Sequence, residues 1–209
     1  TLVGDGSLVE NCTNYGQVTG YRYTGGIAGY NGGGDSGYGI ISNSTNHGKV
    51  IGNGKQGGGI VGINYCGDVI SCVNKGQITE AMYAGGIVGY GDGSTAKIGK
   101  IDLCTIEGSV LASSAGGGIC GYNRNYSRIT NSSNSGSIES MGDYAGGVCG
   151  YNETNGIVYN CTNTGSVKSN KYTGDIIGND ASATAPKATS SAASSLAMTS
   201  LKYLLEDLR

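Results

Sequence analysis

The sequence predicts an all-β fold: a parallel β-solenoid of about six coils of 27–33 residues, followed by a short C-terminal helix. Three observations predict it. A two-part motif recurs six times, Ile or Val occupies three fixed positions in each copy, and Gly and Asn lie between those positions. β-Branched side chains favour a pleated, half-buried surface. Repeats that cannot bury an apolar face alone share a continuous core when they stack. Parallel crossovers favour a right-handed coil.

Composition narrows the class of protein. The chain has 41 Gly, one Pro and a net charge of −2. Collagen is excluded because no Gly-X-Y triplet runs through the chain. A net charge of −2 does not supply the self-repulsion of a disordered chain. No apolar stretch approaches the ~20 residues of a membrane helix, so we expect no membrane insertion. Without a basic excess, nucleic acid is not an expected partner.

The first part of the motif reads Gly-Gly-Ile-x-Gly, with Val for Ile in one copy. Its copies are Gly25–Gly29, Gly58–Gly62, Gly85–Gly89, Gly117–Gly121, Gly146–Gly150 and a degraded Gly174–Gly178. The second part precedes each of these copies and ends on Val or Ile. Its copies are Asn11–Val18, Asn43–Val50, Ser71–Ile78, Leu103–Val110, Asn131–Ile138 and Asn160–Val167.

Aligning the copies gives three columns of Ile and Val, which predict three short apolar strands per coil. The first column is Val9, Ile41, Val69, Ile101, Ile129 and Val158. The second is Val18, Val50, Ile78, Val110, Ile138 and Val167. The third is Ile27, Ile60, Ile87, Ile119, Val148 and Ile176.

A column of Asn lies in the turns, where each Asn precedes a Gly by two residues. Its members are Asn14, Asn46, Asn74, Asn134 and Asn163, and Ile106 is the one departure. Asn and Gly are favoured in turns. We expect the stacked amides to hydrogen-bond from coil to coil.

This pattern resembles the GLUG-motif repeat family, whose name describes Gly, an aliphatic residue, a hydrophobic residue and Gly. The pattern is matched at 26–29, 59–62, 86–89, 118–121 and 147–150, whereas Asp175 breaks it in the sixth copy. Repeats of the family that this chain resembles are found in bacterial surface and secreted proteins. These include adhesins and the non-catalytic regions of IgA-cleaving metallopeptidases. The resemblance therefore implies a location outside the cell or on its surface, and it brings no catalytic residue.

The positions of the seven cysteines in the repeats indicate small core residues rather than a set of disulfide bonds. Four of them share one column with Ser44 and Ser132: Cys12, Cys72, Cys104 and Cys161. Cys120 and Cys149 share another column with Ala and Val. We expect buried free thiols, with Cys66, which lies off both columns, as the candidate for a bridge. No Cys-x-x-Cys occurs and there is one His, so no zinc site is expected.

No constellation for catalysis is found. No two carboxylates are predicted to converge as glycoside hydrolysis requires, and the single His47 lies beside a turn glycine. We expect no enzyme activity and no cofactor. An ice-binding surface is disfavoured, because the outward column of Thr13, Thr45, Thr105 and Thr162 has no second column of Thr beside it.

Among the recurring residues, the tyrosines give the strongest indication of a functional surface. One set follows the last Gly of the motif: Tyr30, Tyr90, Tyr122 and Tyr151. A second set precedes the motif's second position by three residues: Tyr23, Tyr83, Tyr144 and Tyr172. These rings are either ladders that cover the rod or a strip that binds a sugar or a protein, since Tyr is rigid, amphipathic and enriched at interfaces.

The C-terminal part has a different composition, so we divide the chain into a solenoid (1–180), an Ala/Ser/Thr-rich linker (181–199) and an amphipathic helix (200–209). Four leucines recur at i, i+3, i+4 and i+7: Leu201, Leu204, Leu205 and Leu208. So short a helix is unstable alone, so it is expected to dock over the last coil or against another chain. A slight preference goes to assembly, because a local cap would not need so long a tether.

Together these features favour a non-enzymatic structural or adhesive module of a bacterial cell-surface or secreted protein. It would display loops and Tyr ladders to a protein or glycan of a host or bacterial surface. A carbohydrate-binding or accessory domain of a larger secreted enzyme is the first alternative. The second is a fibre subunit that stacks end to end, since open solenoid ends are unpaired strand edges.

Overall fold

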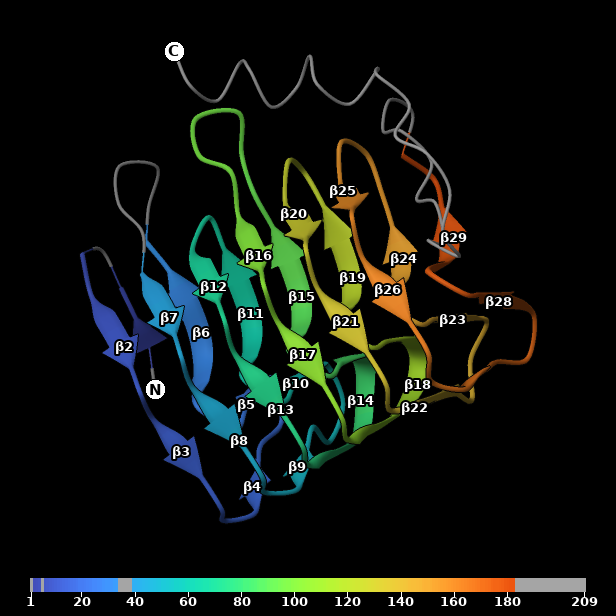
Figure 1. Cartoon of the computed structure of the whole chain (residues 1–209), viewed down its shortest axis with the longest axis horizontal. Coiled ribbons are helices and arrows are strands. Elements are labelled where there is room, and N and C mark those ends of the chain that lie inside the picture. The colour runs from blue at the N-terminus through green and yellow to red at the C-terminus, as the bar shows by residue number, and fades with distance from the viewer. Residues whose placement is uncertain (1, 5, 34–38, 183–209) are drawn as a thin grey trace.

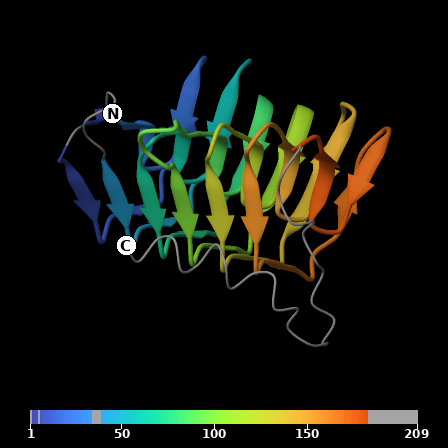
Figure 2. The ribbon, with the colours of Figure 1, turned by 90° about the horizontal axis from the view of Figure 1, so that it is seen from above.

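The chain folds as a parallel β-solenoid in the computed structural model, which describes residues 2–4, 6–33 and 39–182 (Figure 1). Strands of successive coils pair in parallel and in register. The coils stack along one axis, from the blue N-terminal coil to the red C-terminal coil (Figure 2). The predicted all-β parallel β-solenoid of about six coils is therefore confirmed. The predicted linker from residue 183 onward and the helix of residues 200–209 lie outside the described residues.

Strand β1 (Leu2–Val3) precedes the first full coil. The first coil contains β2 (Leu8–Glu10), β3 (Thr13–Asn14), β4 (Val18–Thr19), β5 (Tyr23–Gly25) and β6 (Ala28–Gly32). The second contains β7 (Ile40–Ser42), β8 (Thr45–Asn46), β9 (Val50–Ile51), β10 (Gln56–Gly58) and β11 (Val61–Tyr65). The third contains β12 (Asp68–Ile70), β13 (Val73–Asn74), β14 (Gln77–Gly85) and β15 (Val88–Asp92).

The later coils repeat this order. The fourth contains β16 (Lys100–Asp102), β17 (Thr105–Ile106), β18 (Ser109–Gly117) and β19 (Cys120–Arg124). The fifth contains β20 (Arg128–Thr130), β21 (Ser133–Asn134), β22 (Ser137–Ser140), β23 (Tyr144–Gly146) and β24 (Cys149–Asn152). The sixth contains β25 (Ile157–Tyr159), β26 (Thr162–Asn163), β27 (Val167–Lys168), β28 (Tyr172–Gly174) and β29 (Ile177–Asp180).

A coil has five strand positions rather than the three expected, and the third Ile and Val column is not a strand but lies in the turn between two of them, as Ile27 does between β5 and β6. In the third and fourth coils two of these positions merge into the longer strands β14 and β18. The strands that the sequence did not reveal are the Thr-Asn corner, as in β8, and the strand that starts on Tyr, as in β5. Neither carries a recurring inward Ile or Val, because Ile106 in the corner strand β17 is a single departure, so a search for apolar columns passes over both.

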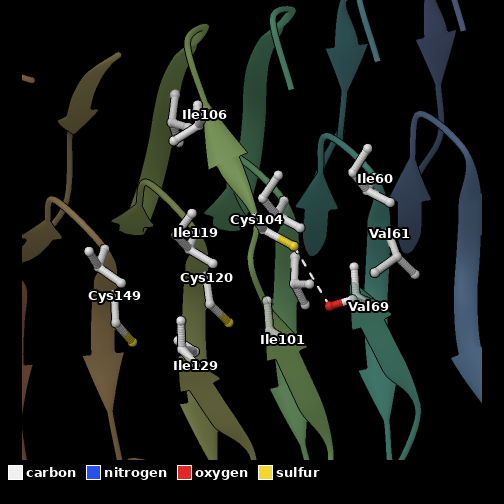
Figure 3. Packing of buried hydrophobic residues seen from close by; sticks show 14 of the residues in the cluster. Ile60, Val61, Val69, Ile101, Cys104, Ile106, Ile119, Cys120, Ile129 and Cys149 are labelled. Atoms are coloured by element: carbon white, nitrogen blue, oxygen red, sulfur yellow. Dashed lines mark hydrogen bonds between the residues drawn. The ribbon is translucent and has the colours of Figure 1, made fainter. Parts of the chain in front are cut away.

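The three Ile and Val columns form the core, as predicted. In the middle coils their side chains are fully buried, as for Ile41, Ile78 and Ile87. Figure 3 shows this packing, together with the Cys104 thiol, which lies 3.6 Å from the Val69 carbonyl oxygen to which it donates. Columns lose burial at the ends of the stack, where Val9, Val18 and Ile27 are only partly buried. Stacking therefore supplies the burial that a single repeat lacks.

The predicted Asn ladder is present. The amide of Asn14 donates to Asn46 at 2.8 Å, and Asn46 donates to Asn74 at 2.8 Å. Farther along, Asn134 donates to Asn163 at 2.7 Å. Each Asn side chain thus provides a hydrogen-bond partner for the Asn of the neighbouring coil. A buried polar group without such a partner would lower the stability of the fold. Ile106 interrupts the ladder and is fully buried.

A second Asn ladder runs through the strands that follow the Gly-Gly-Ile-x-Gly motif. Asn31 donates to Asn64 at 2.8 Å, and Asn123 donates to Asn152 at 2.8 Å. Asn152 in turn donates to Asp180 at 3.0 Å. A usable signal for this ladder was present, because Asn follows the motif's last Gly by two residues in four of the six copies. Apolar periodicity alone does not reveal it.

All seven cysteines are free, and six of them are buried. Cys12 is exposed because it belongs to the first coil. The expectation of free thiols acting as small core residues is thus met, and the off-column Cys66 is also buried and free.

The degraded sixth copy keeps the register of the stack. Strand β28 pairs with β23, so that Gly174 lies beside Gly146, and β29 pairs with β24. The carboxylate of Asp175 accepts a hydrogen bond of 3.0 Å from Asn163. Within the described residues, no helix has the length and apolar character needed to span a membrane.

Candidate functional site: a tyrosine face

The first set of tyrosines stacks along the seven-stranded sheet. Tyr90 pairs in register with Tyr122, and Tyr122 with Tyr151, on strands β15, β19 and β24. Tyr30 is separated from them by Ile63, which occupies the same column in the second coil. The column therefore has a continuous run of three rings and an isolated fourth.

The second set lies in the neighbouring strand row, where Tyr23, Tyr144 and Tyr172 begin β5, β23 and β28 and Tyr83 lies within β14. Tyr144 pairs in register with Tyr172, whereas Gln56 separates Tyr23 from Tyr83 and Ala115 separates Tyr83 from Tyr144. In each coil a tight turn joins this row to the first, which brings the two sets together. The turn requires Gly: a Cβ added to Gly85 would lie 1.9 Å from the Val88 carbonyl oxygen.

Six rings from the third to the sixth coil make one connected cluster, which we call the tyrosine face. It consists of Tyr83, Tyr90, Tyr122, Tyr144, Tyr151 and Tyr172. Ring centroids in contact are 4.8–5.9 Å apart. None of the six is fully buried. Tyr23 and Tyr30 form a separate pair 6.2 Å apart. The structure thus brings together six of the eight tyrosines that the sequence singled out.

Stacking along the column leaves the middle ring, Tyr122, only its edges to offer to a partner. Tyr90 and Tyr122 stack at 5.1 Å with planes 7° apart, and Tyr122 and Tyr151 stack at 5.1 Å with planes 12° apart. Both faces of the middle ring are therefore covered by its neighbours. A sugar that recognises Tyr by stacking needs a free ring face, whereas edges suit apolar side chains and hydrogen-bond acceptors.

A row of polar side chains borders the tyrosine face, two residues beyond the first set. Arg124 pairs with Asp92 at 3.2 Å, and its guanidinium carbon lies 5.3 Å from the Tyr90 ring centroid. The Tyr122 hydroxyl donates to the Glu153 carboxylate. Sequence reasoning missed this row. The recurring Tyr-x-charged spacing at Tyr90-x-Asp92 and Tyr122-x-Arg124 was the available signal.

Three tyrosines of this face, Tyr90, Tyr122 and Tyr151, have raised pKa values and are held in their neutral form. Burial raises the pKa of Tyr90 to about 12. Burial is also the largest cause of the raised pKa of Tyr122. The hydrogen bond to Glu153 and the negative charge of that carboxylate raise this pKa further. The pKa of Tyr151 is raised for the same first reason, burial. The hydroxyl groups of Tyr90 and Tyr151 thus keep their protons at neutral pH, whereas the Tyr122 hydroxyl already donates to Glu153.

The remaining candidates do not gather at this face. The described residues contain no group of three or more His, Cys, Asp and Glu side chains placed to hold a metal ion. The leucines proposed for assembly, Leu201, Leu204, Leu205 and Leu208, lie outside the described residues. What the tyrosine face can do chemically is to contact a partner through ring edges, hydroxyl groups and the adjoining charges.

Comparison with known proteins agrees with the repeat pattern. The family model of the GLUG motif matches residues 112–139 and 142–168. These are two adjacent repeats, which between them contribute Tyr122, Tyr144 and Tyr151 to the region of the tyrosine face. No match was found among curated proteins or among solved structures. The chain is thus a β-solenoid that carries GLUG-motif repeats, as its sequence indicated.

Proposed function

We propose that the protein is a non-enzymatic adhesive module of a bacterial cell-surface or secreted protein, and that its tyrosine face is the contact surface. The observation that carries this proposal is the cluster itself. Six tyrosines from four successive coils touch one another and stay partly exposed. Tyr combines a large contact area with few rotatable bonds, so a partner gains contact at a small entropy cost.

The ring geometry favours a protein partner over a glycan. Both faces of Tyr122 and one face each of Tyr90 and Tyr151 are used in mutual stacking. The ring edges and the hydroxyl groups of Tyr90 and Tyr151 are left for apolar side chains and carbonyl oxygens of a partner. The neighbouring Asp92, Arg124 and Glu153 supply both signs of charge at the rim, where charges direct specificity more than affinity.

A binding experiment with matched variants tests this proposal. The full chain is assayed against a panel of immobilised extracellular proteins and an array of immobilised glycans. The double variant Tyr122→Ser/Tyr151→Ser should weaken binding to the recognised protein at least about tenfold, as for residues at the centre of an interface. The control is Tyr15→Ser, because Tyr15 is 76% exposed and stacks on His47 away from the tyrosine face.

Three outcomes would contradict parts of the proposal. Undiminished binding by the double variant, with unchanged circular dichroism, would remove the tyrosine face from adhesion. Binding confined to glycans would favour the carbohydrate-binding alternative. Failure of an antibody against the chain to label intact bacteria, together with its absence from the medium, would argue against the surface or secreted location.

A further inference from the structure

We propose that Asn11 and Asn43 are acceptor sites for N-linked glycosylation by a diphosphate-activated sugar. The inference goes beyond the proposed function, because neither residue belongs to the tyrosine face. Its starting point is the motif Asn-x-Ser/Thr, in which x is not Pro and the side-chain amide of Asn is the acceptor. The chain contains this motif at Asn11, Asn43, Asn125, Asn131, Asn152 and Asn160.

Four of these asparagines occupy one column, at the corner between the first two strands of a coil. Asn11 lies between β2 and β3, and Asn43 lies between β7 and β8 (Figure 1). Asn131 and Asn160 occupy the same corner in the fifth and sixth coils. All four are exposed, with φ between 48° and 55°. An acceptor asparagine has to lie on such an exposed turn for an enzyme to reach it.

The left-handed corner does not by itself require the motif. Ser71 adopts the same conformation at φ 53°, and Leu103 adopts it at φ 55°. Two residues after the corner, Val73 lies in register with Thr45, so the fold also accepts an apolar side chain at the hydroxyl position. Wherever the corner residue is Asn, however, Ser or Thr follows two residues later. This joint occurrence of amide and hydroxyl is what an acceptor motif demands.

In the first two coils the acceptor amide and the hydroxyl both lie on the outside of the solenoid. Ser44 is fully buried, whereas Asn43 before it is exposed and Thr45 after it is partly exposed. Asn11 and Thr13 are both exposed. Among the described residues, no hydrogen-bond partner is found for the side-chain amides of Asn11 and Asn43. Both amides are therefore free to react.

The other two corner asparagines are held in hydrogen bonds. Asn131 Nδ2 donates to Asp102 Oδ1 at 2.9 Å, and Asn160 Nδ2 donates to Asn131 Oδ1 at 2.7 Å. A hydrogen bond to a carboxylate is stronger than one between neutral groups. The amide of Asn131 would have to leave this partner before its nitrogen could bond to a sugar. We therefore expect no sugar on Asn131 or Asn160.

Burial excludes the two motifs that lie outside the corner column. Asn152 is fully buried, and its Nδ2 donates to the Gly156 carbonyl oxygen at 3.0 Å. Asn125 Nδ2 donates to Asp92 Oδ1 at 3.0 Å, and the hydroxyl residue of its motif, Ser127, is fully buried. The structure thus separates two usable acceptors from four that the folded chain withholds.

The transfer is a substitution at the anomeric carbon of the sugar donor. A bond forms between that carbon and Asn Nδ2, and the bond from the carbon to its phosphate oxygen breaks. The leaving group is a nucleoside diphosphate or a polyprenyl diphosphate, which keeps the electron pair of the broken bond. The amide nitrogen loses one proton.

Mass spectrometry of the native chain, purified from the organism that makes it, tests the inference. Trypsin separates the two sites, because Asn11 lies in the peptide that ends at Arg22 and Asn43 in the peptide that ends at Lys49. At least one of these peptides should carry a sugar. A single sugar unit would indicate a nucleotide sugar as the donor, and a larger preassembled oligosaccharide would indicate a lipid-linked donor.

Two variants made in the same organism sharpen the test. Thr13→Val/Thr45→Val keeps both asparagines but removes both hydroxyl groups, and Val73 shows that the column accepts Val. This variant should lose the sugar from both peptides. The matched control is Thr105→Val, which makes the same change in the same column after Leu103, where no acceptor Asn is present. It should keep the wild-type modification. Circular dichroism establishes that both variants fold.

Three results would overturn the inference. The first is a wild-type chain whose peptides ending at Arg22 and Lys49 are both unmodified. The second is a sugar that persists on these peptides in Thr13→Val/Thr45→Val. The third is a sugar found only on the peptide that ends at Lys168, which carries Asn131, Asn152 and Asn160. No adhesion is measured, so these results leave the proposed function standing, and a failed binding panel leaves this inference standing.

Discussion

The hydroxyl group of Ser127 fills the space that Gly91 leaves in the second Asn ladder. A Cβ added to Gly91 would lie 2.8 Å from Ser127 Oγ and 3.0 Å from Asn123 Oδ1. Gly91 stands where other coils have Asn, in register with Asn64 and Asn123. Ser127 stands where the other coils have Gly, such as Gly67 and Gly156. The two departures from the repeat are therefore one compensated exchange.

This exchange leaves two polar atoms buried, since Ser127 Oγ and Asn123 Oδ1 make no hydrogen bond within the described residues. Gly91→Asn alone should lower the free energy of unfolding by about 1–3 kcal/mol, because the new side chain meets Ser127. Adding Ser127→Gly should relieve the clash and let the new amide join Asn64 to Asn123. We expect a coupling energy of about 1–3 kcal/mol in a double-mutant cycle measured by chemical denaturation. Additive effects would show that the two positions are independent.

Leu103 is held in a left-handed backbone conformation that its side chain disfavours. Its φ is 55°, and the same column holds Asn at φ 49° in Asn131 and 51° in Asn160. Left-handed geometry costs most residues about 1–2 kcal/mol, and Asn tolerates it. Leu103 is 55% exposed, so little burial is lost on replacement. Leu103→Asn should raise the free energy of unfolding by about 0.5–1 kcal/mol. Leu103→Ala, which keeps the strain, should give no such gain.

The fold was predictable because parallel in-register stacking makes every coil obey the same constraints. Val69, Ile101 and Ile129 must all be apolar since each lies on the one before, so the column is visible in a single sequence. The corner strand that starts at Thr45 and the strand that starts at Tyr23 were missed, because backbone pairing rather than apolar side chains defines them.

The site was predictable only in part. Recurrence in the sequence singled out the tyrosines and placed Tyr83 near Tyr90 of its own coil. It could not show that the ring centroid of Tyr83 also lies 4.8 Å from that of Tyr122 in the following coil. That contact depends on how tightly the turn after Gly85 folds. The Glu153 contact with Tyr122 joins residues 31 positions apart, and no pattern of single residues reveals it.

Thiol labelling should separate Cys12 from the other six cysteines. Cys12 is exposed, and the others are buried. Burial raises the pKa of Cys120 to about 12 and that of Cys161 to about 11, which further suppresses the reactive thiolate. Mass spectrometry after treatment of the native protein with a maleimide should show one label. Denaturation without a reductant should expose all seven. A smaller number after denaturation would reveal disulfides.

Alkaline pH should destabilise the fold through the tyrosine face. The pKa of Tyr90 is about 12 in the folded chain, against about 10 for an unfolded Tyr. Between these values the unfolded chain releases the proton and the folded chain keeps it. The contribution to stability is thus complete below pH ~10 and is lost as pH rises toward 12. Denaturation curves should show this fall, and Tyr90→Phe should reduce its slope. An equal slope in the variant would contradict the assignment.

The last prediction concerns Asp175, which marks the end of regular stacking. In earlier coils the motif's second Gly leaves room for the corner Asn of the following coil: a Cβ on Gly147 would lie 2.3 Å from Asn163 Cγ. Asp175 fills the equivalent space at the sixth coil and bonds back to Asn163 at 3.0 Å. We expect this side chain to block the stacking of another coil, including the first coil of a second copy.

Removing that side chain should therefore favour end-to-end association. Asp175→Gly restores the motif and reopens the space, at a cost of about 0.5–1.5 kcal/mol for the lost hydrogen bond. Unpaired parallel strand edges are ready templates for pairing, so light scattering should show a mass that rises with concentration more steeply than for the wild-type chain. Asp175→Asn is the matched control, because it keeps the volume and the acceptor that meet Asn163, and it should behave like the wild type. If Asp175→Gly and Asp175→Asn have the same mass at every concentration, the block at this end lies elsewhere, and the fibre hypothesis has to be judged on the strand edges alone.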